Sequence, residues 1–108
     1  MNRRSPVYMT ERYVKWVNKL KDRSARQKIL LRVDRLVEEG NPGDSRALSG
    51  GIIEMKINYG PGYRVYYAQQ GKTVVILLAG GDKSTQSADI LVARKLLREA
   101  REDRTNGW

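Results

Sequence analysis

The sequence contains no cysteine and no histidine. The absence of cysteine excludes disulfide bonds and catalysis by a thiolate, and the absence of both residue types removes the usual ligands of zinc. No apolar run approaches the roughly 20 residues that a membrane-spanning helix needs, and the N-terminus lacks the apolar core of a signal peptide. We therefore expect a cytoplasmic protein that uses no metal, no small-molecule cofactor and no membrane.

Positive charge is what the sequence has in excess. Its 108 residues include 21 Lys and Arg against 12 Asp and Glu, a net charge of +9, and its pI is near 10.1. Residues 1–40 alone hold 11 basic and 5 acidic side chains. A positive field of this size attracts polyanions, so nucleic acid is the leading class of partner. The length is that of one domain, which we expect to span residues 1–108.

Apolar residues recur at helical spacing in the first forty residues. A short strand over residues 6–9 is expected to precede a helix that Thr10 caps and that buries Trp16. A second helix is expected over residues 24–39, with Gly40 as its C-terminal stop. The two helices form an αα-hairpin.

The middle of the chain has the pattern of strands and turns. Residues 41–51 are rich in Gly, Pro, Asn, Asp and Ser, which predicts a crossover from the helices to a sheet. Period-two alternation predicts strands over residues 53–59 and 63–68. A third strand, over residues 73–79, is apolar without a break, which indicates a central strand covered on both faces.

A final helix is expected after a turn at Gly80 and Gly81, with Ser84 or Thr85 as its cap and an apolar stripe that ends near Ala100. The order is then strand, two helices, three strands and a helix. This order predicts an α+β fold, with an N-terminal strand and α-helical hairpin followed by a mostly antiparallel sheet and a C-terminal helix.

Strand pairing brings basic residues together. Lys56 and Arg64 occupy the polar faces of neighbouring strands, and a hairpin places such residues on one side of a sheet. Lys83, at the end of the adjoining strand, can join them. Three converging cations suit a phosphate, whose charge offsets their mutual repulsion. The alternative is that Lys56, Arg64 and Lys83 are ordinary, solvent-exposed charges of a basic protein.

We expect Arg46, Tyr66 and Gln86 to contact RNA. Tyr66 shares its strand face with Arg64 and can stack on a base, although a half-buried tyrosine with a hydrated hydroxyl is the alternative. Gln86 lies about one turn before Asp89 near the start of the last helix, where the helix dipole alone explains an acidic residue.

Two sequence strings resemble a known family. GYRVYY at residues 62–67 and GGDKSTQSADI at residues 80–90, with the order of elements, resemble the RelE/ParE toxin superfamily, and above all its HigB-like branch of addiction module killer proteins. The similarity runs from about Tyr8 to Leu97. It implies a RelE-like toxin of a type II toxin–antitoxin system, an endoribonuclease that enters the ribosomal A site and cleaves mRNA with the RNA's own 2′-hydroxyl as nucleophile.

The resemblance assigns the catalytic positions to three residues. Arg64 matches the family's arginine after Gly-Tyr, Lys56 a basic residue on the preceding strand, and Lys83 a basic residue after the glycine turn. Related toxins often place a tyrosine or histidine where this chain has Asp89 and Ile90, so the groups that move protons stay open. Lys56 or Lys83 can serve as acid or base if neighbouring cations lower its pKa, while Arg64 holds the phosphate.

The resemblance also implies partners, namely the ribosome with its mRNA and a cognate antitoxin, often a helix-turn-helix protein in this branch. ParE-like members of the superfamily inhibit DNA gyrase instead, so the fold alone does not decide the function. A non-enzymatic nucleic-acid-binding module is a further alternative, for which the charge suffices. An Arg64→Lys change separates the endoribonuclease from the binding module, because it spares electrostatic binding but damages bidentate phosphate contacts.

Overall fold

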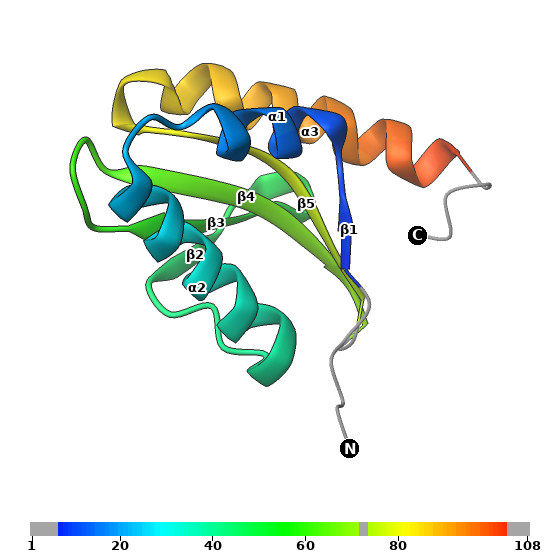
Figure 1. Cartoon of the computed structure of the whole chain (residues 1–108). Helices are drawn as coiled ribbons and strands as arrows, with labels where there is room; N and C mark the ends of the chain where they lie inside the picture. The colour runs from blue at the N-terminus through cyan, green and yellow to red at the C-terminus, as the bar shows by residue number, and fades with distance from the viewer. Residues whose placement is uncertain (1–6, 72–73, 104–108) are drawn as a thin grey trace.

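A computed structural model describes residues 7–71 and 74–103 and shows one five-stranded sheet (Figure 1). Its strand order is β1-β5-β4-β3-β2. The strands are β1 (Val7–Met9), β2 (Ser45–Ala47), β3 (Ile53–Ile57), β4 (Tyr63–Gln70) and β5 (Val74–Gly81). β1 runs parallel to β5, and the other neighbouring pairs are antiparallel. The predicted α+β fold with a mostly antiparallel sheet is confirmed.

Helices cover both faces of this sheet, and Figure 1 shows α2 and α3 on opposite sides of it. The helices are α1 (Glu11–Lys19), α2 (Arg23–Glu39) and α3 (Gln86–Glu102), with single 3-10 turns η1 (Ser49–Gly51) and η2 (Lys83–Thr85). Thr10 caps α1 by accepting a hydrogen bond from the Tyr13 amide, and Gly40 ends α2 in the left-handed region at φ 69°. No helix in the described ranges is long and apolar enough to cross a membrane.

Alternation along β4 divides the core into two layers. Tyr63, Val65 and Tyr67 pack against α1 and α2, whereas Tyr66 and Ala68 pack against α3. Since successive strand residues point to opposite faces, Arg64 shares the α3 side. β5 lies between β1 and β4 and contributes buried residues to both layers, as its unbroken apolar run predicts.

The crossover from helices to sheet contains a strand that the sequence pattern does not predict. β2 lies within residues 41–51 and pairs with β3, with Arg46 opposite Glu54. Three residues, of which Arg46 and Ala47 are exposed, are too few for a period-two pattern. Pro6 and Thr73, which the expected strands include, lie outside the described residues.

The predicted glycine turn is wrong, because Gly80 and Gly81 continue β5. A Cβ at Gly80 would overlap the Trp16 ring, and a Cβ at Gly81 would overlap the Asp89 carboxylate. The glycines therefore provide space for neighbouring side chains rather than a turn. Thr85 is the N-cap residue of α3, as predicted, although its side chain forms no capping hydrogen bond. Asp82 caps the preceding turn η2 by accepting a hydrogen bond from the Ser84 amide at 2.8 Å.

Candidate functional site

Strand register builds a polar site on the sheet face toward α3. Arg46 on β2 is opposite Glu54 on β3, and Lys56 on β3 is opposite Arg64 on β4. Glu54 and Lys56 are two residues apart on β3, so the two pairs lie next to each other on the same face of the sheet. Gln86, the first residue of α3, contacts Glu54 on this face. Here lies a cleft of about 370 Å³, the site cleft, lined by Asp44, Ser45, Arg46, Glu54, Lys56, Arg64 and Gln86.

Glu54 lies at the centre of the site cleft and is 3% exposed. Its carboxylate accepts hydrogen bonds from Arg46 Nε at 2.9 Å and from Gln86 Nε2 at 2.8 Å. Burial raises the pKa of Glu54, but the hydrogen bonds from Gln86 and Arg46 and the charges of Arg46 and Arg64 outweigh it, so the pKa lies below its usual value. Glu54 is therefore an anion among the cations of the cleft.

Arg64 is buried, so the alternative of an ordinary surface charge is wrong for this residue. It is 5% exposed, and its Nη1 donates a hydrogen bond to the Gly62 carbonyl at 2.6 Å. Gly62 permits this approach, because a Cβ there would lie 3.2 Å from Nη1. Within the described chain, the Nε of Arg64 has no hydrogen-bond partner. A buried cation with an unsatisfied N–H is suited to an anion that supplies the missing acceptor.

The site cleft gathers four of the residues selected from the sequence, namely Arg46, Lys56, Arg64 and Gln86. Lys83 does not line it, because η2 carries Lys83 to an exposed position beside Gly62.

Tyr66 has no face available to a base. It is 0% exposed, because α3 packs over it. The predicted stacking role therefore does not fit this structure, and neither does a hydrated hydroxyl, since the oxygen is buried and without a hydrogen-bond partner among the described residues. Burial is also the main reason that the pKa of Tyr66 is raised.

Three cleft residues, Glu54, Asp44 and Ser45, are absent from the sequence-based selection. Alternation places Glu54 on the strand face of Lys56, but a search for cations alone does not select an acid. A lone carboxylate within a row of basic residues is the signal that could have found it. Asp44 is placed by a contact with Asn58, whose Nδ2 donates to its carboxylate at 2.9 Å, and composition does not reveal that contact.

Asp89, at the position where the resemblance leads us to expect a tyrosine or histidine, does not line the site cleft. It is 8% exposed and accepts a hydrogen bond from Thr85 Oγ1 at 2.5 Å in the first turn of α3. This geometry supports the interpretation that Asp89 stabilises the start of the helix.

Sequence comparison identifies relatives over most of the chain. The family model described as "Phage derived protein Gp49-like (DUF891)" matches residues 15–103. A Haemophilus influenzae protein, described as uncharacterized, is 49% identical over 84 residues, which are 78% of this chain and 84% of that protein.

Solved structures share the fold at low sequence identity. A mutant of the E. coli toxin RelE in the free state gives a TM-score of 0.61 at 20% identity, covering 82% of this chain and 96% of that chain. The E. coli RelBE toxin–antitoxin complex gives 0.60 at 20% identity, covering 72% and 95%. RelBE2 of Mycobacterium tuberculosis gives 0.55 at 19% identity, covering 74% and 99%. The chain therefore has a RelE-like fold and belongs to the Gp49-like family of phage-derived proteins (DUF891).

Proposed function

We propose that this protein is the toxin of a type II toxin–antitoxin system, a single-domain, ribosome-dependent endoribonuclease that cleaves mRNA. The observation that carries the proposal is the site cleft, in which the buried Arg64 has an unsatisfied Nε beside Arg46 and Lys56. The similar solved structures support the class, because they are described as a toxin and as toxin–antitoxin complexes. A cognate helix-turn-helix antitoxin and the HigB-like branch stay predictions.

A phosphate is the ligand that suits the cations of the cleft. Arg46 and Arg64 flank the Glu54 carboxylate, with nitrogen–oxygen distances of 2.9 Å and 3.8 Å. The longer distance leaves the Nε of Arg64 without a hydrogen bond, so a phosphate oxygen gains a donor that Glu54 does not use. Positively charged groups fixed before the reaction stabilise the charge that develops on phosphorus oxygens in the transition state.

In the proposed reaction the 2′-oxygen of the RNA attacks the adjacent phosphorus. The O2′–P bond forms and the P–O5′ bond breaks, which gives a 2′,3′-cyclic phosphate and a free 5′-hydroxyl. The ionised Glu54 carboxylate accepts the proton of the 2′-hydroxyl, and the Lys56 ammonium donates one to the departing 5′-oxygen. Glu54 replaces Lys83 as the favoured proton-transfer group, because Glu54 lines the cleft and Lys83 does not.

The pH dependence of cleavage on programmed ribosomes tests the assignment of Glu54. A carboxylate with a lowered pKa is already ionised, so the single-turnover rate should stay flat between about pH 6 and pH 8. A lysine base predicts a rate that rises nearly tenfold per pH unit there. Glu54→Gln should lower the rate by about 10²–10⁴-fold, whereas Glu54→Asp keeps a base and should lose less. A steep rise with pH, or near-wild-type cleavage by folded Glu54→Gln, would contradict the assignment.

The alternative functions have separate tests. Inhibition of gyrase supercoiling by the purified protein, with mRNA left intact in cells, would support the ParE-like alternative. Tight nucleic-acid binding that Arg64→Lys leaves unchanged, with no RNA cleaved, would support a non-enzymatic binding module.

A further inference from the structure

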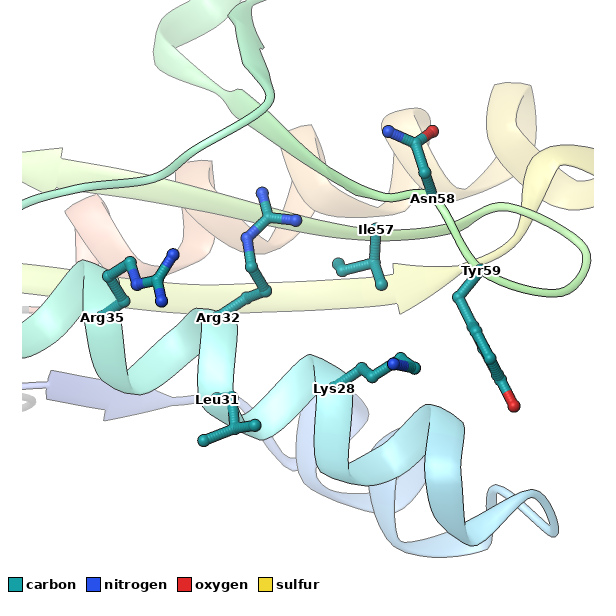
Figure 2. A pocket seen from close by; sticks show the side chains of 7 residues that line it. All are labelled: Lys28, Leu31, Arg32, Arg35, Ile57, Asn58 and Tyr59. Carbon is teal, nitrogen blue, oxygen red and sulfur yellow. The ribbon is translucent and has the colours of Figure 1, made fainter.

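A second basic cleft lies on the opposite side of β3 from the site cleft. We call it the α2–β3 cleft, because α2 and the end of β3 form its two walls (Figure 2). Its volume is about 390 Å³. α2 contributes Lys28, Leu31, Arg32 and Arg35. Their spacing of three and four residues places them on one face of the helix, so three cations line the same cleft.

One of these cations, Arg32, has a structural role. Its guanidinium donates hydrogen bonds to the Lys56 carbonyl at 2.9 Å and to the Pro42 carbonyl at 2.7 Å. It therefore ties α2 to β3 and to the segment that leads into β2. Figure 2 shows Arg32 extended toward β3, while Lys28 points toward Tyr59.

The other two cations, Lys28 and Arg35, are available to a ligand. Both are exposed, and neither forms an ion pair within residues 7–71 and 74–103. The Nζ of Lys28 lies 5.0 Å from the centre of the Tyr59 ring. Among the described residues that line the α2–β3 cleft, none is acidic. A cleft with two unpaired cations and an aromatic ring suits a ligand that is both anionic and flat.

The two clefts share a wall. Lys56 lines the site cleft with its side chain, while its carbonyl accepts the hydrogen bond from Arg32. The next residues, Ile57 and Asn58, line the α2–β3 cleft, and the Asn58 amide binds the Asp44 carboxylate that lines the site cleft. Beyond the Ser45–Met55 pair the segment that leads into β2 stays beside β3, because the Lys56 amide donates a hydrogen bond to the Asp44 carbonyl at 2.8 Å. This segment and the end of β3 separate the two clefts, and a polymer that occupies the site cleft can continue past them.

We propose that the α2–β3 cleft is a second RNA-binding subsite, in which Lys28 and Arg35 bind phosphates and Tyr59 stacks on an unpaired base. The proposal rests on the proposed function in that it takes RNA as the ligand. Cations that contact phosphates combined with an aromatic platform are the usual means of binding single-stranded RNA. The RNA is either the mRNA strand that leaves the site cleft or a strand of the ribosome.

Binding of a 2′-O-methyl RNA oligonucleotide, which lacks the nucleophilic hydroxyl and is not cleaved, tests the subsite in full-length protein. Lys28→Ala with Arg35→Ala should weaken binding and lower the slope of log affinity against log salt by about 1.4, because each phosphate contact on a single strand contributes about 0.7. The matched control is Lys95→Ala with Arg98→Ala, which removes the same charge from exposed positions on α3. The control should keep the wild-type slope, and both variants should keep the wild-type melting temperature.

Variants of Tyr59 distinguish base stacking from electrostatic contributions to RNA binding. Tyr59→Leu should weaken oligonucleotide binding about tenfold without changing the salt slope, because base stacking is independent of salt, and Tyr59→Phe should bind like the wild type. The same binding series on ribosomes without mRNA identifies the source of the RNA. A loss with the oligonucleotide assigns the subsite to the mRNA strand, and a loss with ribosomes alone assigns it to ribosomal RNA; either result supports the proposal.

The proposal is overturned if the Lys28 and Arg35 double variant matches its control with both the oligonucleotide and ribosomes. It is also overturned if that variant loses only binding of poly-glutamate, because the α2–β3 cleft would then recognise an acidic protein segment. Cleavage by the wild type and by Arg64→Ala, measured in parallel, reports on the proposed function separately. Wild-type cleavage with an unaffected double variant refutes the subsite alone, whereas RNA binding through the subsite without any cleavage refutes the endoribonuclease alone.

Discussion

The Nε of Arg64 lies 3.8 Å from an oxygen of Glu54, and the two residues are 5% and 3% exposed. Strand register sets this contact, because Arg64 pairs with Lys56, two residues along β3 from Glu54 on the same face. Buried charges are costly without a partner, so each residue makes the burial of the other possible. The two side chains that we propose for catalysis thus also stabilise the sheet around the site cleft.

Replacing Arg64 should affect both activity and stability. Arg64→Ala removes a fixed donor to the phosphate, which should lower single-turnover cleavage on programmed ribosomes by about 10²–10³-fold. It also removes a buried charged hydrogen-bonding group, which should lower the free energy of unfolding by about 1–3 kcal/mol. Arg64→Lys should lose less stability than activity, because lysine keeps the positive charge but lacks the planar guanidinium that binds a phosphate through two N–H groups. Near-wild-type cleavage by folded Arg64→Ala would show that the site is placed wrongly.

The stability of the protein should depend on pH through Glu54. The pKa of Glu54 in the folded protein lies below its usual value of 4.5. Its contribution to stability is therefore present above about pH 4.5 and is lost as the pH falls through the folded pKa. Glu54→Gln lacks this contribution, so urea unfolding should show a large stability difference from the wild type at neutral pH and a smaller one in acid. A difference that stays constant with pH would contradict the assigned pKa.

Gly81 should tolerate no side chain while Asp89 is present. A Cβ at residue 81 would overlap the Asp89 carboxylate, so Gly81→Ala should destabilise the protein by about 1–3 kcal/mol. Asp89→Ala alone should cost less, since it loses only the hydrogen bond from Thr85 and the favourable interaction with the helix end. In a double-mutant cycle the two changes should cost less together than the sum of the separate costs. Additive costs would argue against the overlap.

The two lysines selected from the sequence should differ in importance. Lys56 lines the site cleft, whereas Lys83 is exposed outside it. Lys56→Ala should therefore lower cleavage by about 10²–10⁴-fold, the usual contribution of a proton-transfer group. Lys83→Ala should lower it by less than about tenfold, the effect of a solvent-exposed charge outside the cleft. Equal losses in single-turnover rate would show that Lys83 enters the cleft when RNA binds.

The sequence predicts the long, periodic elements of the fold and fails at the short ones. β3 and β4 can be predicted from a short stretch of sequence, because successive side chains face opposite sides of the sheet and the residue types alternate accordingly. β2 has three residues and depends on pairing with β3, which composition does not show. The placement of Gly80 and Gly81 in β5 depends on side chains from α1 and α3, so it also follows from tertiary contacts.

The candidate site shows the same limit. Alternation and pairing are enough to bring Lys56 and Arg64 together, because both follow from a hairpin register. The burial of Arg64 and the hydrogen bonds of Glu54 depend on two other elements. β2, which pairs with β3, supplies Arg46, and α3, which packs on this face of the sheet, supplies Gln86. Tyr66 is hidden for the same reason, since α3 covers its face of the sheet.

The most direct test of the central claim is induced expression of the protein in bacteria, followed by mapping of the 5′ ends of cellular mRNA. The proposed function predicts growth arrest and new 5′-hydroxyl ends within translated reading frames, while Arg64→Ala at equal soluble expression produces neither. Blocking translation initiation should remove the cuts, because cleavage requires the ribosome. Growth arrest with intact mRNA, or cuts spread equally over translated and untranslated RNA, would contradict the claim that this protein cleaves mRNA on the ribosome.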